Sequence, residues 1–443
     1  MRKPKFSPGL TLCAGLALFA SACAVSSIHN ESYVSGALNE RTGHALKLPG
    51  SDSKLPPGIS LDDGLSADES IAVALWNNAQ FQATLADLGL SRADLVEAGL
   101  LRNPIFSFLF PIGVKQLEFT LGLPFEFLWQ RPNRIAEARL NTEKVAQNLI
   151  QHGLDLCRDT VSAWADLNSA RAKSDFEKKE IALYGTIAAN AAARLKAGEI
   201  SGREEAAARK LAAEGHDHAI LAERDAEIAE HRLRSYLGLP MDGAPLPLTP
   251  PAEPPSLPDD PRSLLDSAFA ARPDLRAAEL AVEAAGRRVG WERAKIVNFT
   301  AQLDANGAGK EGFEMGPGFQ LEIPLLNQNN GRIARAKAEL TQASLQYLAV
   351  KDRIALEVMT ARSRYGAAKD ALAALRGRAL AAATTEAETA RAAFKAGEIA
   401  SQDLAEAEIR YWTSKILEAD AQAELLKAQA ALKHGIGFTS PVK

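Results

Sequence analysis

The chain has 443 residues, of which 47% are apolar, 24% are charged and 6% are aromatic, and its formal net charge is −4. A surface that binds nucleic acid is expected to be dominated by basic patches, so this charge balance excludes that class of partner. The abundance of Ala, Leu, Glu, Lys and Arg is typical of long helices packed on one another rather than of a large globular enzyme core.

Residues 1–22 predict an export signal. Arg2, Lys3 and Lys5 form a positively charged start, and the apolar run from Leu10 to Phe19 is too short to cross a bilayer. Small side chains follow at 20–22, where cleavage is expected.

Two interpretations of the cleavage point remain open. Residues 20–22 read Ala-Ser-Ala, an ordinary A-x-A site, whereas Cys23 directly after them resembles a bacterial lipobox, in which this cysteine becomes the acylated N-terminus. Lipoboxes usually carry Leu where this chain has Ala20. We expect a lipid anchor at Cys23, and Ala24 in place of Asp favours the outer membrane in that resemblance. Residues 23–64 hold Pro, Ser and Gly with little periodicity, and they predict an extended tether.

Two parts of the chain, about 200 residues apart, repeat one another in order. Lys-Ala-Gly-Glu-Ile occurs at 196–200 and again at 395–399, and Arg-Ile-Ala at 134–136 recurs at 332–334. Several landmarks in one order at nearly constant spacing predict a duplicated architecture. We place a first repeat at 65–240, a Pro-rich connector at 241–261, a second repeat at 262–438 and a tail at 439–443.

Each repeat contains a stretch with two short segments in which apolar and polar residues alternate. This stretch lies at about 103–127 in the first repeat and at about 297–325 in the second. Period-2 alternation predicts strands with one apolar and one polar face, and so two hairpins. The apolar positions are Leu117, Phe119, Leu121 and Leu123 in the first repeat and Phe299, Ala301, Leu303 and Ala305 in the second. Soluble hairpins packed on helices and passes of a membrane barrel both fit this pattern. Four strands cannot close a barrel, which needs about eight, so a barrel would require several copies.

Long helices follow the strands in both repeats. No proline occurs from Arg134 to Lys196 or from Arg332 to Lys395, so each stretch can extend over about 95 Å. A second helix is expected after each, to about 237 and 434, and Gly198 and Gly397 suit the reversals because glycine adopts positive φ readily. Steps of three and four predict a coiled-coil seam along the later stretch. Its positions are Leu340, Ala343, Tyr347, Val350, Ile354, Val358, Ala361, Tyr365, Ala368, Leu372 and Leu375.

No constellation of residues predicts catalysis or a resident metal. The sequence lacks HExxH, GxSxG, paired CxxC motifs and a Gly-rich phosphate loop. His216 and His218 are two residues apart, and side chains with that spacing on a helix point apart. We therefore expect no enzyme activity, no cofactor and no metal site.

The order of short helix, Asn-Pro, two strands, long helix, Ala-Gly turn and long helix, met twice, resembles the TolC-like outer-membrane efflux factors. The resemblance covers about Leu65 to Phe438. Its local matches are Ala72 to Asn78, Gly99 to Pro104, Ala271 to Leu275 and Leu321 to Leu325. The family implies a mainly α fold with a small β part, built as a homotrimer. Twelve strands, four per chain, would close one barrel in the outer membrane, and twelve long helices would continue it as a periplasmic tunnel.

The function implied by the resemblance is passive conduction from periplasm to exterior in a tripartite efflux or secretion system. A periplasmic adaptor, an inner-membrane pump and outer-membrane lipid are the implied partners, and no nucleic acid is expected. A periplasmic coiled-coil lipoprotein scaffold without pore activity is the alternative, and a secreted enzyme with an unrecognised site is a third. The passage 125–136 is faintly similar to the heavy-metal branch, yet Gln-Arg-Pro at 130–132 replaces that branch's Gly-Lys-Arg, so the exported substrate stays open.

The resemblance also implies two sets of functional residues. Acidic residues soon after the second turn narrow the tunnel entrance in the family, and Asp403 and Glu406 are the matching gate positions, one turn apart. The first repeat has Glu204 and Glu205 but Ala207, so its acidic ring is incomplete. The two turns are the implied docking points for the adaptor: Lys196, Gly198, Glu199, Ile200, Lys395, Gly397, Glu398 and Ile399. Solvated helix charges and well-capped turns are the respective structural alternatives.

Overall fold

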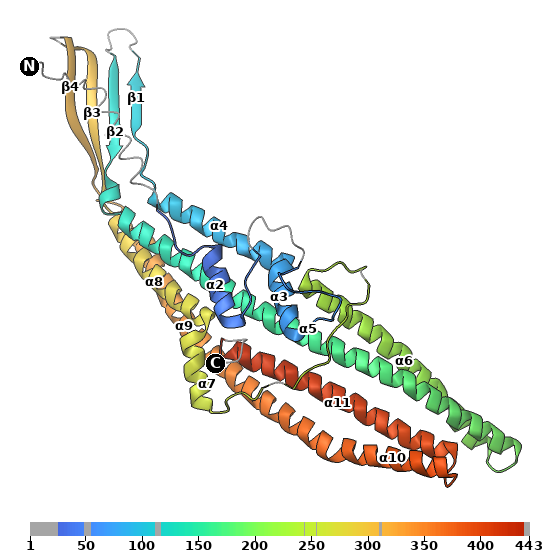
Figure 1. The fold of residues 1–443 in the computed structure, drawn as a ribbon. Helices are drawn as coiled ribbons and strands as arrows, with labels where there is room; N and C mark the ends of the chain where they lie inside the picture. Colours follow the sequence, from blue (N-terminus) through green and yellow to red (C-terminus); the bar gives the residue numbers. More distant parts are fainter. Residues whose placement is uncertain are drawn as a thin grey trace, which may run out of the picture. The chain divides into compact units, whose positions relative to one another are not determined.

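The computed structural model describes residues 25–47, 55–110, 117–242, 244–253, 255–309 and 312–437 (Figure 1). Long helices dominate it and strands make a small part, which confirms the expected fold class at this level. In chain order the elements are α2 (Glu31–Thr42), α3 (Ala67–Asn77), α4 (Ala79–Gly99), β1 (Ile105–Leu109), β2 (Glu118–Pro124), the 3-10 turn η1 (Glu126–Leu128), α5 (Arg131–Lys196), α6 (Gly202–Leu237), α7 (Pro261–Ala271), α8 (Pro273–Ala294), β3 (Asn298–Gly309), β4 (Gly312–Glu322), α9 (Asn330–Ala374), the π-helical segment η2 (Leu375–Leu380), α10 (Ala381–Ala396) and α11 (Ser401–Gly435).

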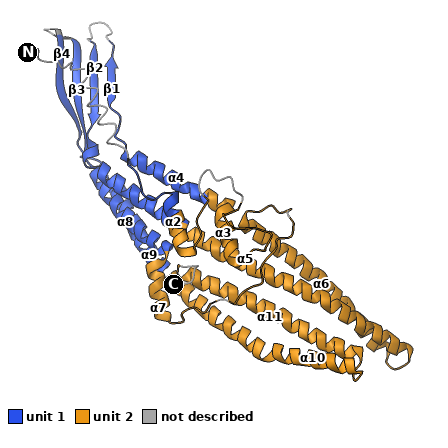
Figure 2. Ribbon diagram, viewed as in Figure 1, with its two compact units in different colours: residues 1–34, 84–149, 273–352 blue, residues 35–83, 150–272, 353–443 orange. Residues whose placement is uncertain are grey.

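The chain divides into two compact units (Figure 2). Unit 1 takes residues 1–34, 84–149 and 273–352, and unit 2 takes residues 35–83, 150–272 and 353–443. The sheet and the first parts of α5 and α9 belong to unit 1, and the remaining parts of the long helical hairpins belong to unit 2. Each unit therefore draws on both sequence repeats, so the repeats are not separate compact bodies.

The four strands form one antiparallel sheet in the order β1-β2-β3-β4. The two expected hairpins are confirmed, and the β2–β3 pairing joins them across the repeats. In that pairing Phe119 lies opposite Ala305 and Leu121 lies opposite Leu303. Strands β1 and β4 are the edges of the sheet within the chain, and each is hydrogen-bonded on one side only in the described residues.

One face of the sheet is apolar, as the alternation predicts. The pairs Phe106–Leu121, Phe108–Phe119, Ala301–Phe319 and Phe299–Leu321 all lie on it, because directly opposed residues in a ladder share a face. The rings of Phe108 and Phe119 meet with centroids 5.0 Å apart. This face is not covered by other described parts of the chain, since Phe106 is 64% exposed and Phe319 is 70% exposed.

The opposite face carries a ladder of polar side chains. Thr120 Oγ1 donates a hydrogen bond of 2.8 Å to Asp304 Oδ1, and Gln302 Nε2 donates one of 3.3 Å to Gln320 Oε1. The ladder ends at Asn298, whose Nδ2 donates to Glu322 Oε2 at 2.7 Å. The sheet therefore has one exposed apolar face and one hydrogen-bonded polar face.

In unit 2 the start and end of α6 are defined by its sequence. Ser201 begins the helix with a capping box, in which its hydroxyl accepts from the Glu204 backbone N–H while the Glu204 carboxylate accepts from Ser201 N at 2.8 Å. Gly238 ends it with φ of +61°, and a Cβ there would lie 2.5 Å from the carbonyl oxygen of Asn77. Glycine is therefore needed both for the left-handed turn and for the approach of α6 to α3.

The predicted coiled-coil seam of α9 is confirmed by burial. Its most central positions are buried, and the remaining ones are half-buried. The buried members are Ala343, Ile354, Val358, Ala361, Tyr365 and Leu372. Small and branched side chains in a three-four pattern pack in this way along facing helices.

The helix predicted from Arg332 to Lys395 is interrupted by a π-helical turn at Leu375–Leu380. The chain stays helical through this widened turn because no proline occurs in it. Side-chain contacts to other segments are made at the same place. Arg376 lies in this turn, and its guanidinium donates to Glu253 of the connector at 2.6 Å and to Glu418 of α11 at 2.8 Å. The spacing of apolar residues along the sequence does not predict these ion pairs or the π-helical turn.

The extended conformation expected for residues 23–64 is wrong for part of that stretch, because Glu31–Thr42 forms helix α2. The reason is a tertiary contact. Leu38 is fully buried, and its methyl groups lie so close to Gly153 of α5 that a Cβ there would be 2.7 Å away. Packing on α5 stabilises helix α2, which the local pattern of apolar residues does not predict. The described helices include none that is long and apolar enough to cross a bilayer.

Candidate gate and docking turns of the helical hairpins

The first candidate site is the turn that joins α5 to α6. Gly198 has φ of +75°, and the N–H of Glu199 donates to the carbonyl of Arg194 at 2.9 Å. This six-to-one bond is the signature of a Schellman cap, for which glycine is the favoured residue. Lys196 and Glu199 are exposed, and Ile200 is half-buried.

The turn between α10 and α11 repeats this geometry. Gly397 has φ of +78°, and the N–H of Glu398 donates to the carbonyl of Ala393 at 2.9 Å. Lys395 and Glu398 are exposed and Ile399 is half-buried, as in the first turn. The duplicated pentapeptide therefore builds two equivalent tips, each presenting one cation and one anion to solvent.

A large apolar side chain precedes the lysine at each tip. Leu195 is 37% exposed and Phe394 is 43% exposed. The repeated Lys-Ala-Gly-Glu-Ile motif pointed to the turns, but these two neighbours differ between the repeats and escaped notice in the sequence. Each tip thus combines an exposed apolar side chain with a charge pair.

The two predicted gate carboxylates lie in the first turns of α11. Asp403 is exposed, and its Oδ2 accepts a hydrogen bond of 3.1 Å from the backbone N–H of Ala400. Glu406 is half-buried and accepts a hydrogen bond of 3.1 Å from Gln402 Nε2. Asp403 therefore has a local role as the cap of α11, in addition to any role of its charge.

The first repeat uses its acidic residues in the same local way. Glu204, which corresponds to Asp403, closes the capping box of α6, and the backbone N–H and hydroxyl of Ser201 lower the pKa of Glu204. Glu205 pairs with Arg209 one turn later. Within one chain, the acidic residues after both turns therefore make their hydrogen bonds and ion pairs with residues of the same helix or its N-cap.

A buried carboxylate between the hairpins was missed by the sequence analysis. Glu180 of α5 is 4% exposed and accepts hydrogen bonds from Thr413 Oγ1 at 3.2 Å and from Tyr184 at 3.4 Å. Burial, followed by the charge of nearby Glu177, raises the pKa of Glu180 to about 7. The spacing of Glu177, Glu180 and Tyr184 on one helix face was the available signal, but it does not show that the face is buried.

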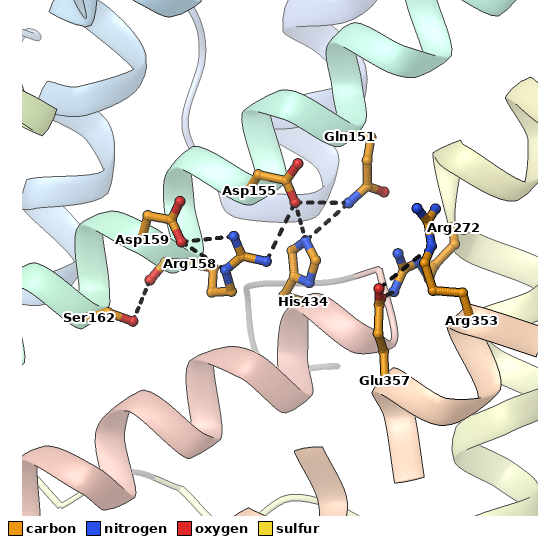
Figure 3. A network of polar contacts seen from close by, with 9 residues as sticks. All are labelled: Gln151, Asp155, Arg158, Asp159, Ser162, Arg272, Arg353, Glu357 and His434. Atoms are coloured by element: carbon orange, nitrogen blue, oxygen red, sulfur yellow. Dashed lines mark hydrogen bonds and ion pairs between the residues drawn. The ribbon is translucent and has the colours of Figure 1, made fainter. Parts of the chain in front are cut away.

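A second polar network joins α5 to the end of α11 (Figure 3). His434 is buried, and its Nε2 lies 2.5 Å from Asp155 Oδ1 and 3.0 Å from Gln151 Nε2. Burial opposes ionisation of Asp155, but the hydrogen bond and charge of His434 and the charge of Arg158 outweigh it and lower the pKa of Asp155. Figure 3 also shows Arg272, which is almost fully buried and pairs with Glu357 at 2.6 Å.

Chemistry beyond these contacts is sparse in the described part of the chain. There, no group of three or more His, Cys, Asp or Glu side chains is arranged to hold a metal ion. Cys157 is fully buried, and burial raises the pKa of its thiol well above the usual range. A thiol of this kind is inert and belongs to the packing. Cys23 and the export signal lie outside the described residues.

Comparison with known sequences points to one family. Residues 264–437 match the family described as outer membrane efflux protein. The chain is also similar to the outer membrane efflux protein BepC of Brucella suis biovar 1 (strain 1330), with 25% identity over 319 residues. That alignment covers 70% of this chain and 69% of BepC.

Solved structures share the fold. The outer-membrane channel OprN superposes with a TM-score of 0.70 at 20% identity, over 88% of this chain and 96% of OprN. CusC, whose structures concern folding and transmembrane channel formation, has a TM-score of 0.68 at 18% identity, over 88% and 99% of the two chains. The Campylobacter jejuni CmeC outer membrane channel has a TM-score of 0.70 at 12% identity, over 89% and 92%.

These findings confirm the resemblance noted in the sequence. The family profile lies in the second repeat, the BepC alignment extends over most of the chain, and the fold is that of known outer-membrane channels. The matched family is described as efflux proteins, and the superposed structures are described as outer-membrane channels. Residues 264–437 therefore match the outer membrane efflux protein family, and the chain shares its fold with solved outer-membrane channels.

Proposed function

We propose that this protein is the outer-membrane exit duct of a tripartite efflux or secretion system. It conducts substrate passively from the periplasm to the exterior. The observation that carries the proposal is the amphipathic four-stranded sheet, whose apolar face is bare while its polar face is hydrogen-bonded. Lipid is the medium that makes such a face favourable, because transferring apolar area out of water gains about 25 cal/mol per Å².

The duct is a homotrimer in this proposal. Strands β1 and β4 each have one unpaired edge in the described chain, and an exposed edge seeks another strand. Joining β1 of one copy to β4 of the next in a ring of three gives a twelve-stranded barrel, which has no edges left. The long hairpins of the three copies then form the periplasmic tunnel, and Cys23 anchors each chain in the outer membrane.

The gate in this proposal is the set of Asp403 and Glu406 carboxylates from the three copies. Asp403 is exposed and Glu406 is half-buried in one chain, so both carboxylates are accessible to a neighbouring copy. Converging carboxylates attract cations and repel one another, so they favour cation passage and resist close approach. Opening must therefore separate them.

The two hairpin tips are the proposed docking points for the periplasmic adaptor, which connects the duct to an inner-membrane pump. Their exposed Leu195 and Phe394 supply apolar contact, and the flanking charges supply orientation. Photo-crosslinking side chains at Glu199 and Glu398 should capture the adaptor in intact cells. The same probe at the exposed Glu223 of α6 is the control, and equal capture there would contradict tip docking.

Single-channel conductance of the detergent-purified protein in a planar bilayer tests the central proposal, with native mass spectrometry to count the copies. We expect a trimer and a small, cation-preferring conductance. A folded trimer that forms no pore would refute the duct and return the assignment to a periplasmic scaffold. Mass spectrometry of the mature N-terminus reports separately on Cys23, because acylation adds a diacylglycerol and a fatty acid to that residue.

A further inference from the structure

A polar cavity of about 420 Å³ lies in unit 1 at the root of the sheet. It is open to solvent on one side and is lined by residues from the loop after α4, the start of α5, the end of α8, both strands of the second hairpin and the start of α9. The side chains that matter here are Arg102, Arg134, Lys295, Arg332, Asn298 and Glu322. Four cations and one carboxylate thus line a cavity large enough for a small organic or inorganic solute.

The positive charge of this cavity is only partly compensated by the protein. Arg102 pairs with Glu126 at 2.9 Å, and Lys295 pairs with Glu292 at 2.7 Å. Arg134 donates to two backbone carbonyls at the end of α4, which carry no net charge. Arg332 is exposed, and no ion pair to it occurs among the described residues. At least two guanidinium groups therefore face the cavity without a carboxylate of their own.

The electrostatics of Arg134 agree with a crowded cationic site. Burial, followed by the like charges of Arg102 and Arg131, lowers the pKa of Arg134. Glu322 is the only acidic lining residue that the structure describes there, and its carboxylate accepts from the amide of Asn298 at 2.7 Å. An anion in the cavity would relieve the repulsion between the guanidinium groups.

Trp291 supplies an aromatic part of the same wall. Its ring lines the cavity and lies under Lys295, with Nζ 3.7 Å from the ring centroid. Its indole Nε1 is buried and has no hydrogen-bond partner among the described residues. Because solvent does not reach this N–H, it does not face the open volume of the cavity, and we do not count it among the ligands.

We propose that this cavity binds a phosphate-class oxyanion of a small soluble solute, with Arg332 as its principal ligand and with Arg134 and Lys295 beside it. Guanidinium groups match the planar fork of two phosphate oxygens, and an ammonium group adds a point charge. Asn298 and Glu322 belong to the polar face of the sheet, so the cavity adjoins the surface that lines the conduit in the proposed function. Its role in transit rests on that proposed function, whereas the binding itself does not.

Isothermal titration of detergent-purified protein with inorganic phosphate tests the site directly. Arg332→Gln should weaken binding at least tenfold, because it removes a charged donor without breaking an ion pair. Lys295→Gln is the second variant and should act in the same direction. Because it also breaks the ion pair with the buried Glu292, its thermal unfolding is compared with that of wild type to separate lost binding from lost structure. Arg335→Gln is the matched control, since Arg335 lies one turn further along α9, is exposed, pairs with Glu339 and does not line the cavity. Equal phosphate affinity in wild type and in Arg332→Gln would overturn the proposal.

A second arm separates a soluble anion from a lipid headgroup. The same variants are placed in nanodiscs of phosphatidylcholine alone or with phosphatidylglycerol. Phosphate binding that persists in both supports a soluble ligand, and binding abolished by phosphatidylglycerol would assign the site to lipid instead. Conductance of the same samples distinguishes the two proposals of function: a pore without phosphate binding refutes only the site, and phosphate binding without a pore refutes only the duct.

Discussion

At the residue scale, Asp403 combines a structural and a proposed electrostatic role in one carboxylate. Asp403→Asn keeps a side-chain oxygen for the Ala400 N–H but removes the charge, whereas Asp403→Ala removes both. We expect Asp403→Asn to raise single-channel conductance and reduce cation preference with unchanged stability. Asp403→Ala should in addition lose about 0.5–1.5 kcal/mol, the usual net contribution of one hydrogen bond.

The control for this prediction is Glu204→Gln, the corresponding capping position in the first repeat. It removes one charge per chain at the first repeat, where Ala207 stands in place of the carboxylate that corresponds to Glu406. Conductance and selectivity should remain near wild type in this variant. If Asp403→Asn and Glu204→Gln change the conductance equally, the charge of Asp403 has no special place in the gate.

Glu180 predicts a pH dependence of stability. Its pKa is raised from 4.5 to about 7 in the folded chain, so the folded state binds this proton more tightly than the unfolded state. The corresponding stability is fully present below pH of about 4.5 and is lost as the pH rises through about 7. Glu180→Gln stays neutral and keeps an acceptor for Thr413.

Thermal unfolding at pH 5 and pH 8 measures this effect. The midpoint of the wild type should fall by at least about 2 °C between the two values. Glu180→Gln should show a smaller fall, while Glu223→Gln, a change at an exposed carboxylate, should behave like wild type. The same pH response in all three proteins would mean that Glu180 is not the titrating group.

At the element scale, the sheet carries apolar side chains on one face and polar side chains on the other. Phe319 points to the apolar face of β4, and its neighbour Gln320 points to the polar face. Phe319→Arg should abolish membrane insertion, because arginine on a lipid-facing strand costs about 2–4 kcal/mol at mid-bilayer. Gln320→Arg adds the same charge to the other face and should leave insertion intact while reducing cation preference.

Fractionation of cells expressing each variant, followed by bilayer recordings of those that insert, measures both expectations. Equal insertion of the two variants would show that the apolar face does not contact lipid. The sheet would then be a soluble hairpin pair that packs on another protein.

At the scale of the whole molecule, the long helices leave apolar side chains without cover in one chain. Leu345 and Leu348 on α9 are 62% and 54% exposed, although they adjoin the buried seam. In the proposed trimer such side chains are covered by a neighbouring copy. Leu348→Glu should therefore shift the oligomer from trimer toward monomer in native mass spectrometry.

Gln346→Glu is the control for this prediction, because it adds the same charge to an exposed position of the same turn. Its trimer should persist. Retention of the trimer in Leu348→Glu would place the subunit interface on another helix face.

The sequence predicted those features that depend on neighbours along the chain. Alternation at Phe119 and Leu121 reported the sheet faces, and the spacing of Ile354 and Val358 reported the seam, because side-chain direction follows from the period of each element. Gly198 and Gly397 predicted the turns, because glycine, which has no Cβ, adopts positive φ without strain. The roles of the two turns and of Asp403 and Glu406 stay predictions, because they concern copies and partners beyond one chain.

By itself, the sequence determined the duplication, the element types, the reversals and the amphipathic character of strands and helices. Only the tertiary structure decided that β2 pairs with β3 and that Glu180 is buried beside Thr413. It also decided that Leu38 packs on α5, which stabilises helix α2 within the stretch expected to be extended. It also brought Arg102, Lys295 and Arg332, which are far apart in the chain, around one cavity. The physical reason is that burial and charge depend on the packing of distant segments, which local periodicity does not specify.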